Sequence, residues 1–322
     1  MCGIAGFYGE GDEDTLERMS ETLARRGPDD AGIWKHKNIG LAHTRLSIID
    51  LSSAGHQPMT SSTGKTSIVF NGEIYNYREI KKEIRESYKF GSSTDTEVIL
   101  ALYEERGVKA FESLNGMFAF ALYDHGTATL YLVRDRMGKK PLYWGVFDGT
   151  LIFGSELKAL MQHEKFKKEI DPEAVRTYLV YECVPTPLSI FKGVRKVRAG
   201  EYVAFLGGKE PREESFWNLK REPLNITFTE ALAVLDKKIV SAVERRLESD
   251  VPLGVFLSGG LDSSTISWYA QKASAAPVNT FSIGFTDKDF DESRYAHAVA
   301  GKLGVHHTME VFSPCTGRGW RG

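Results

Sequence analysis

Hydrophobic residues in the first two hundred positions occur in short runs that are separated by glycine, asparagine and aspartate. Runs of this length with turn residues at both ends predict β-strands, and apolar residues that recur every three or four positions predict helices. The expected strands are residues 66–70, 117–123, 129–134, 141–147 and 150–153, and the expected helices are residues 12–26, 77–87 and 95–106. The pattern predicts a mixed α/β domain with antiparallel strand pairs.

The pattern changes after a polar stretch at residues 207–224, which holds two glycines and two prolines among many charged residues. This composition is typical of a linker. An amphipathic helix is expected over residues 229–248, followed by an apolar run at 251–257, a glycine loop, a helical segment and an apolar run at 280–285. Strand, loop, helix and strand predict a βαβ unit with parallel strands. The expected domains are residues 1–206 and 225–322.

Composition excludes several classes of protein. The 322 residues include 42% hydrophobic side chains, which is typical of a globular chain and not of a disordered, collagen-like or coiled-coil one. The net charge of −2 provides no long-range attraction to nucleic acid or to an anionic membrane. The apolar runs are far shorter than the roughly 20 residues of a membrane-spanning helix. The N-terminus lacks the features of a signal peptide, which predicts a cytoplasmic location.

Three cysteines without CxxC spacing favour neither a disulfide framework nor a zinc site, so any special cysteine acts as a thiol. Cys2 follows Met1, and its small side chain permits removal of that methionine. A cysteine at position one carries an α-amino group of pKa about 7.7 to 8.0, which can take the thiol proton near neutral pH. If Met1 is retained, Cys2 is a cysteine near a chain terminus.

Acyl transfer also requires donors for the developing oxyanion. Asn71 and Gly72 offer a side-chain amide and a backbone N–H. An Asn-Gly pair after an apolar run is equally a signal for a β-hairpin turn, and the two interpretations are compatible.

Five segments together resemble, in this order, the glutaminase domain of glutamine-hydrolysing asparagine synthetases. They are Cys2-Gly3-Ile4-Ala5-Gly6, Arg25-Arg26-Gly27-Pro28-Asp29, His43-Thr44-Arg45-Leu46-Ser47-Ile48, Phe70-Asn71-Gly72-Glu73-Ile74-Tyr75-Asn76 and Arg134-Asp135-Arg136-Met137-Gly138-Lys139-Lys140-Pro141-Leu142-Tyr143. The resemblance implies an N-terminal-nucleophile (Ntn) hydrolase fold, which is a four-layer αββα sandwich.

The resemblance also implies roles for individual residues. Cys2 is the implied nucleophile, and Asn71 with Gly72 is the implied oxyanion hole. The implied glutamine-binding residues are Arg45, Leu46, Ser47, Ile48, Ile49, Asn71, Gly72, Glu73 and Asp95. Arg45 would hold the α-carboxylate with its planar fork of donors, and Asp95 would pair with the α-amino group. Two simpler interpretations stay open, because Arg45 also suits a surface ion pair and Asp95 also suits the first turn of a helix capped by Thr94 and Glu97.

A second motif, Ser258-Gly259-Gly260-Leu261-Asp262-Ser263-Ser264, lies between a predicted strand and a predicted helix. Backbone N–H groups, hydroxyls and a helix N-terminus converge on an anion in such a loop. The motif resembles the pyrophosphate loop of ATP pyrophosphatases, which implies the start of a Rossmann-like parallel α/β domain of the adenine nucleotide alpha hydrolase-like kind. The implied ATP-binding residues are Leu257, Ser258, Gly259, Gly260, Leu261, Asp262, Ser263, Ser264 and Ile283, with Asp262 also holding Mg²⁺. Leu257 and Ile283 suit a strand core equally well.

Both resemblances together imply that glutamine is hydrolysed at Cys2 and that ammonia converts ATP-activated aspartate, β-aspartyl-AMP, to asparagine. The implied partners are glutamine, aspartate and ATP, and a homodimer is compatible with the family. The resemblance ends near Phe312, and residues 313–322 lack apolar periodicity. We therefore expect a truncated synthetase domain with a sheet of two strands, which leaves an edge and a core face uncovered beside a competent glutaminase.

Three alternatives stay open at this point. In the first alternative the chain is a glutaminase-only fragment. In the second it is a related amidotransferase that acts on another carboxylate, such as a sugar or peptide acid. A third alternative is a non-catalytic protein that binds an amino acid or a partner chain. Retention of Met1 would favour the third, because the amine next to the thiol would then lie in a peptide bond.

Overall fold

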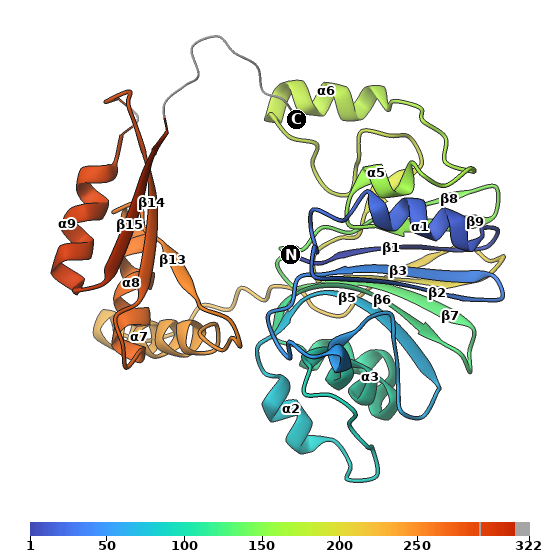
Figure 1. The fold of residues 1–322 in the computed structure, drawn as a ribbon, viewed down its shortest axis with the longest axis horizontal. Helices are drawn as coiled ribbons and strands as arrows, with labels where there is room; N and C mark the ends of the chain where they lie inside the picture. Colours follow the sequence, from blue (N-terminus) through green and yellow to red (C-terminus); the bar gives the residue numbers. More distant parts are fainter. Residues whose placement is uncertain (290, 313–322) are drawn as a thin grey trace. The chain divides into compact units, whose positions relative to one another are not determined.

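The computed structural model describes residues 1–289 and 291–312, so Cys315 and the rest of the segment 313–322 discussed above lie outside the described residues. The chain forms two compact units, Met1–Arg221 and Glu222–Gly322. In the first unit two six-stranded antiparallel sheets lie face to face, with helices on both outer sides (Figure 1). This arrangement confirms the expected αββα sandwich.

The two sheets have similar layouts. The first has the order β10-β8-β9-β1-β3-β2 and the second the order β12-β11-β7-β6-β5-β4. The strands of the first sheet are β1 (Gly3–Tyr8), β2 (Asp30–His36), β3 (Ile39–Arg45), β8 (Tyr143–Phe147), β9 (Thr150–Gly154) and β10 (Val194–Lys196). Those of the second are β4 (Met59–Thr60), β5 (Thr66–Ile74), β6 (Gly116–Asp124), β7 (Thr129–Arg134), β11 (Glu201–Leu206) and β12 (Arg212–Ser215).

Helices cover the outer face of each sheet (Figure 1). The helices of the unit are α1 (Glu13–Glu21), α2 (Tyr77–Glu83), α3 (Asp95–Arg106), α4 (Ala110–Ser113), α5 (Leu157–Leu160) and α6 (Pro172–Tyr181). Side chains of α1 and α5 share a buried cluster with the first sheet, and side chains of α2, α3 and α4 share another with the second sheet. Each sheet is therefore buried on both faces, which explains why its strands are continuous apolar runs.

Successive side chains along a strand point to opposite faces, and the strands follow this period. Ile4 of β1 and Ala121 of β6 lie in the cluster between the sheets. Phe7 of β1 packs towards α1, and Phe120 of β6 packs towards α3. The same period assigns Cys2 and Asn71 to the inner faces of the two sheets, because each lies two residues from an inward-facing side chain.

The predicted strands and helices of the first unit are confirmed, with shifted ends except for β7 and α3, whose predicted bounds hold. The predicted linker needs correction. Part of residues 207–224 forms β12, which pairs antiparallel with β11, and Phe216 is buried in the outer cluster of the second sheet. The first unit therefore ends at Arg221 and not at residue 206, because backbone pairing at a sheet edge tolerates the many charges of this segment.

The second unit contains a parallel sheet of three strands in the order β13-β14-β15. Its elements are α7 (Phe228–Glu244), β13 (Gly254–Phe256), α8 (Leu261–Ala273), β14 (Asn279–Phe285), α9 (Ser293–Leu303) and β15 (His306–Phe312). The βαβ prediction is confirmed, but the expectation of only two strands is wrong. Apolar side chains of the sheet are exposed, including Phe256 at 83% and Ile283 at 60%. None of the described helices is long and apolar enough to span a membrane.

Candidate active site

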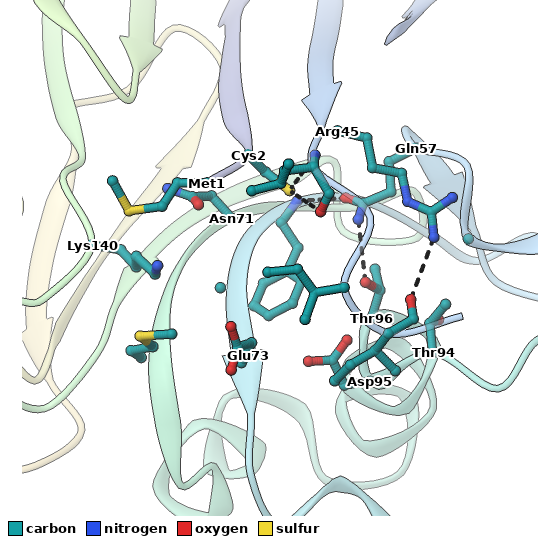
Figure 2. Close-up of a pocket in the computed structure, with 17 residues that line it drawn as sticks. Met1, Cys2, Arg45, Gln57, Asn71, Glu73, Thr94, Asp95, Thr96 and Lys140 are labelled. Atoms are coloured by element: carbon teal, nitrogen blue, oxygen red, sulfur yellow. Dashed lines mark hydrogen bonds between the residues drawn. The ribbon is translucent and has the colours of Figure 1, made fainter. Parts of the chain in front are cut away.

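A cavity of about 140 Å³ lies at the N-terminal end of β1. Its walls come from the chain start, the loop after β3, the middle of β5 and the N-terminus of α3 (Figure 2). The predicted residues that line it are Cys2, Arg45, Leu46, Ile48, Ile49, Asn71, Gly72, Glu73 and Asp95. Ser47 is not among the lining residues, and its backbone N–H donates to Asp29 Oδ2 at 2.7 Å. The fold thus brings together segments that lie far apart in the sequence, as between Cys2 and Lys140, which are 138 positions apart.

Cys2 is held from both sides. Arg26 Nε donates to the Cys2 carbonyl at 2.9 Å, and Arg26 Nη1 forms an ion pair of 2.9 Å with Glu156. The Leu46 N–H donates to Cys2 Sγ at 3.4 Å, a contact that favours a thiolate. Burial nevertheless raises the pKa of the Cys2 thiol and lowers the pKa of the Met1 amine. The thiol therefore needs a base close by to become nucleophilic.

Asn71 and Gly72 lie inside the continuous strand β5, so the hairpin interpretation of this pair is wrong. Gly72 is required by close packing and not by a turn. A Cβ at this position would lie 2.2 Å from the Met117 carbonyl oxygen on β6. The neighbouring strand therefore excludes any larger residue at position 72.

The strand register aims the Gly72 N–H at the cavity. Gly72 stands opposite Phe118 on β6. Both backbone groups of Phe118 bond Asp135, since its N–H donates to Oδ2 and its carbonyl accepts from the Asp135 N–H at 2.8 Å. Gly72 and Phe118 are thus a non-hydrogen-bonded pair, and the Gly72 N–H points away from β6. That direction is the edge of β5 that lines the cavity.

The Asn71 side-chain amide is buried and forms no hydrogen bond with the described residues. It is only 1% exposed, and neither Nδ2 nor Oδ1 has a hydrogen-bond partner within the part of the chain that the structure describes. A buried amide without a partner is costly in a folded protein, of the order of 1 to 3 kcal/mol. Because Asn71 lines the cavity beside Cys2, its donor is available to a bound ligand (Figure 2).

Arg45 is buried, at 6% exposure, so the alternative of a surface ion pair is wrong. Its guanidinium donates to backbone carbonyls of the loop that closes one side of the cavity. Nη1 donates to Ser52 O at 2.9 Å, and Nη2 donates to Ile49 O at 3.4 Å and to Asp50 O. A guanidinium has five N–H donors, so these contacts leave capacity for a carboxylate. The Arg45 guanidinium would then bind both the loop carbonyls and the carboxylate of a bound amino acid.

Asp95 is the first residue of α3, where the Thr94 hydroxyl caps the helix by accepting from the Glu97 N–H. The capping box is only half formed, because the Glu97 carboxylate accepts from Gly91 and Ser92 instead. Asp95 Oδ2 accepts from the Ile74 N–H at 2.8 Å. Burial raises the pKa of Asp95 to about 7, and the charge of nearby Glu73 adds to the rise. An ammonium group is the partner that would restore its ionisation.

Several lining residues were not predicted from the sequence, among them Gln57, Thr96 and Lys140. Lys140 is 6% exposed, and burial lowers its pKa while Glu73 and Cys2 act to raise it. Lys140 lies within the motif Arg134–Tyr143, so the sequence offered a signal for its place in the cavity. Gln57 lies in an irregular loop without periodicity, and nothing in the linear pattern distinguishes it.

A second cavity of about 210 Å³ lies within the second unit. Of the predicted nucleotide residues, Leu257, Ser258 and Ile283 line it. Leu257 is 1% exposed and belongs to a small core cluster as well, so its two interpretations coexist. The residues from Gly259 to Ser264 are not among those that line this cavity.

The glycine loop has features that suit a phosphate. Gly259 has φ +84°, and a Cβ there would lie 2.5 Å from the Ala296 nitrogen, so only glycine fits this left-handed turn against the start of α9. The Ser264 hydroxyl is buried without a partner among the described residues. Helix α8 starts at the loop without a side-chain cap, which leaves N–H donors at its N-terminus. Asp262 is exposed in its first turn, and the described residues hold no group of three or more side chains that could bind a metal alone.

Comparison with known proteins agrees with the division of the chain into two units. Residues 1–217 match a family model described as a glutamine amidotransferase domain, and residues 234–316 match one described as asparagine synthase. A putative glutamine-hydrolysing asparagine synthetase of Methanocaldococcus jannaschii is 36% identical over 97% of this chain and 65% of its own length. An asparagine synthetase of Bacillus subtilis is 34% identical over 98% of this chain and 50% of its own length. The chain thus spans about half to two thirds of the length of these relatives.

A solved structure shares the fold. Glutamine phosphoribosylpyrophosphate amidotransferase from B. subtilis, complexed with ADP and GMP, aligns with a TM-score of 0.50 at 16% identity, covering 96% of this chain and 65% of that one. The resemblance seen in the sequence is confirmed by the family models, of which the first covers well over half of the chain. With a facing pair of sheets, a half-buried Cys2 in the cavity and a matching domain model, the chain belongs to the glutamine amidotransferase family.

Proposed function

We propose that the first unit hydrolyses glutamine and that the ammonia serves a glutamine-dependent asparagine synthesis begun by the second unit. One observation carries the proposal most directly. The thiol of Cys2 shares a cavity with two donors suited to an oxyanion, the unpartnered Asn71 amide and the Gly72 N–H. Arg45 and Asp95 line the same cavity and complement the carboxylate and ammonium groups of an amino acid.

The proposed chemistry follows from these groups. Once Met1 is removed, the free amine of Cys2 takes the thiol proton, and the sulfur attacks the side-chain amide carbon of glutamine. Asn71 and Gly72 stabilise the oxyanion of the tetrahedral intermediate. The ammonium returns the proton to the leaving nitrogen as the C–N bond breaks, which releases ammonia and leaves a thioester. Water then attacks the thioester, which yields glutamate and the free thiol.

For the second unit, the proposed nucleotide site comprises the loop 258–264 with Leu257 and Ile283. The left-handed turn at Gly259, the N-terminus of α8 and the unpartnered Ser264 hydroxyl support a phosphate cradle. Bound Mg²⁺ would neutralise phosphate charge, with Asp262 as one ligand and phosphate oxygens among the others. Aspartate as the acceptor rests on the named relatives alone.

The test of the proposal is release of glutamate from glutamine by the purified chain, with the N-terminus identified by intact mass. Chain lacking Met1 is expected to release glutamate and ammonia in equal amounts. If chain lacking Met1 binds glutamine without releasing glutamate, the non-catalytic alternative holds. Pyrophosphate release that depends on both ATP and aspartate is the matching measurement for the second unit.

Glutamine binding is expected to weaken as the pH falls through about 7. The Asp95 carboxyl has a pKa of about 7 in the free protein, so it is mostly ionised at pH 8 and mostly protonated at pH 6. Only the ionised form attracts the ammonium of glutamine. The dissociation constant should therefore rise about tenfold per pH unit below the pKa. Titration calorimetry on Cys2→Ala between pH 5.5 and 8 measures binding without chemistry.

Asp95→Asn in the same Cys2→Ala background is the control for this pH dependence. It is expected to bind glutamine weakly with a dissociation constant that does not change over this range. If the pH dependence survives in that variant, another group is responsible for it.

A further inference from the structure

The edge of β5 beside the cavity has no neighbouring strand at Asn71 and Gly72, the proposed oxyanion donors. β4 pairs with β5 only at Met59 opposite Ile68 and Thr60 opposite Ser67. Beyond that point side chains bond the backbone groups of Phe70 and the Ile74 N–H on this edge, on either side of Gly72. The Ile74 N–H donates to Asp95, as described above, and both backbone groups of Phe70 bond side chains.

Phe70 directly precedes Asn71, and its peptide groups are held from two directions. The Phe70 N–H donates to Gln57 Oε1 at 2.7 Å. The Phe70 carbonyl lies 3.0 Å from His43 Nε2, so this nitrogen carries the proton and donates. Since the Phe70 carbonyl belongs to the peptide that joins Phe70 to Asn71, these bonds set the orientation in which β5 presents Asn71 and Gly72.

The other end of Gln57 reaches the helix that carries Asp95. Gln57 Nε2 donates to Thr96 Oγ1 at 3.2 Å. Gln57 is 5% exposed and Thr96 is 3% exposed, so the bridge is buried. Buried hydrogen bonds of this kind rigidify and specify local geometry. One side chain therefore connects the strand that carries Asn71 with the helix that begins at Asp95.

We infer that Gln57 is a positioning residue that fixes the oxyanion-binding strand β5 against the amino-acid-binding end of α3. The inference rests on the proposed glutamine hydrolysis and adds a residue to which neither the motifs nor the comparisons assign a role. Gln57 lines the cavity, yet its carbonyl oxygen and its amide nitrogen are each engaged by a protein partner (Figure 2). These two bonds hold Gln57 between β5 and α3, so its proposed effect is on the geometry of Asn71 and Gly72.

The first test is Gln57→Leu, which keeps the size of the side chain and removes both hydrogen bonds. We expect kcat for glutamate release to fall about 10- to 100-fold, because small misplacement of oxyanion donors is costly to the transition state. KM should change less than kcat. Alkylation of Cys2 by iodoacetamide, followed on the N-terminal peptide, should keep its rate, because that reaction uses no oxyanion hole.

The second test isolates the link to the helix. Thr96→Val removes the acceptor of the Gln57 amide, whereas Thr96→Ser keeps it. Thr96→Val is expected to have a lower kcat than Thr96→Ser, and adding it to Gln57→Leu should cause no further loss. Gln162→Leu is a matched control elsewhere in the unit, where the side chain makes a 3.3 Å bond to the Lys158 carbonyl.

Each outcome bears on the inference. A kcat of Gln57→Leu within twofold of wild type overturns it, and so does a rise in KM at unchanged kcat, which would make Gln57 a substrate contact. If Gln57→Leu does not fold, the Thr96 pair decides, and equal kcat values in that pair overturn the link. These results differ from failure of the proposed function, in which the wild-type chain itself releases no glutamate.

Discussion

Cys2→Ala is expected to abolish glutamate release, with a loss of at least about 10³-fold relative to wild type. The reason is that the substitution removes the only atom proposed to form a bond with the substrate. The cavity walls contributed by Asn71, Arg45 and Asp95 stay in place, so glutamine binding should persist. Parallel measurement of glutamate release and of glutamine binding by calorimetry separates the two effects.

Cys183→Ala is the matched control for this substitution. Cys183 is a free and exposed cysteine outside the cavity. We expect Cys183→Ala to release glutamate at the wild-type rate and to keep its reaction with glutamine-like electrophiles. Equal rates of glutamate release in Cys2→Ala and wild type would show that Cys2 is not the nucleophile.

Asn71→Ala is expected to lower kcat for glutamate release by about 10²- to 10³-fold, the usual cost of losing one oxyanion donor. The Gly72 N–H remains, so residual activity should exceed that of Cys2→Ala. KM should change little, because the donor acts on charge that develops in the transition state. Steady-state kinetics on variants with verified removal of Met1 provide the measurement.

The stability of Asn71→Ala distinguishes this mechanism from general damage. In the free protein both polar atoms of Asn71 are buried without a partner among the described residues, so removing them takes away an unsatisfied amide. Thermal unfolding should therefore occur at an unchanged or higher temperature despite the loss of activity. The exposed turn residue Asn38 provides the control substitution Asn38→Ala. A clear drop in the unfolding temperature of Asn71→Ala would assign Asn71 a structural role instead.

Much of the fold was accessible from local pattern. The predicted bounds of β7 and α3 coincide with the observed ones, because turn residues and a capping threonine mark these ends. β12 and β15 are among the strands that were not predicted, and neither is a plain apolar run. β12 is held by backbone pairing to β11, and β15 by pairing to β14. Pairing of this kind uses groups that every residue carries, so the side-chain pattern does not reveal it.

The residues of the candidate site likewise fall into those that the sequence indicated and those that only the fold could place. Cys2 as a candidate nucleophile and the Ser258–Ser264 loop as a candidate phosphate site were indicated by the motifs that contain them, because these signals are local. Whether Asn71 and Gly72 form a turn or a strand depended on β6, which lies opposite them. Whether Arg45 lies at the surface depended on the loop that folds over it. The position of Gln57 between β5 and α3 likewise exists only in the folded molecule.

The sequence by itself indicated the proposed reacting group, the proposed oxyanion pair, the phosphate-type loop and the continuous apolar runs of strands that are buried on both faces. These features reside in residue identity and in spacing over a few positions. The tertiary structure alone decided which edge of β5 faces the cavity, how Asp95 acquires a pKa of about 7, and which side chains hold the site in register. The physical reason is that burial, strand register and hydrogen-bond partners depend on residues distant in the chain.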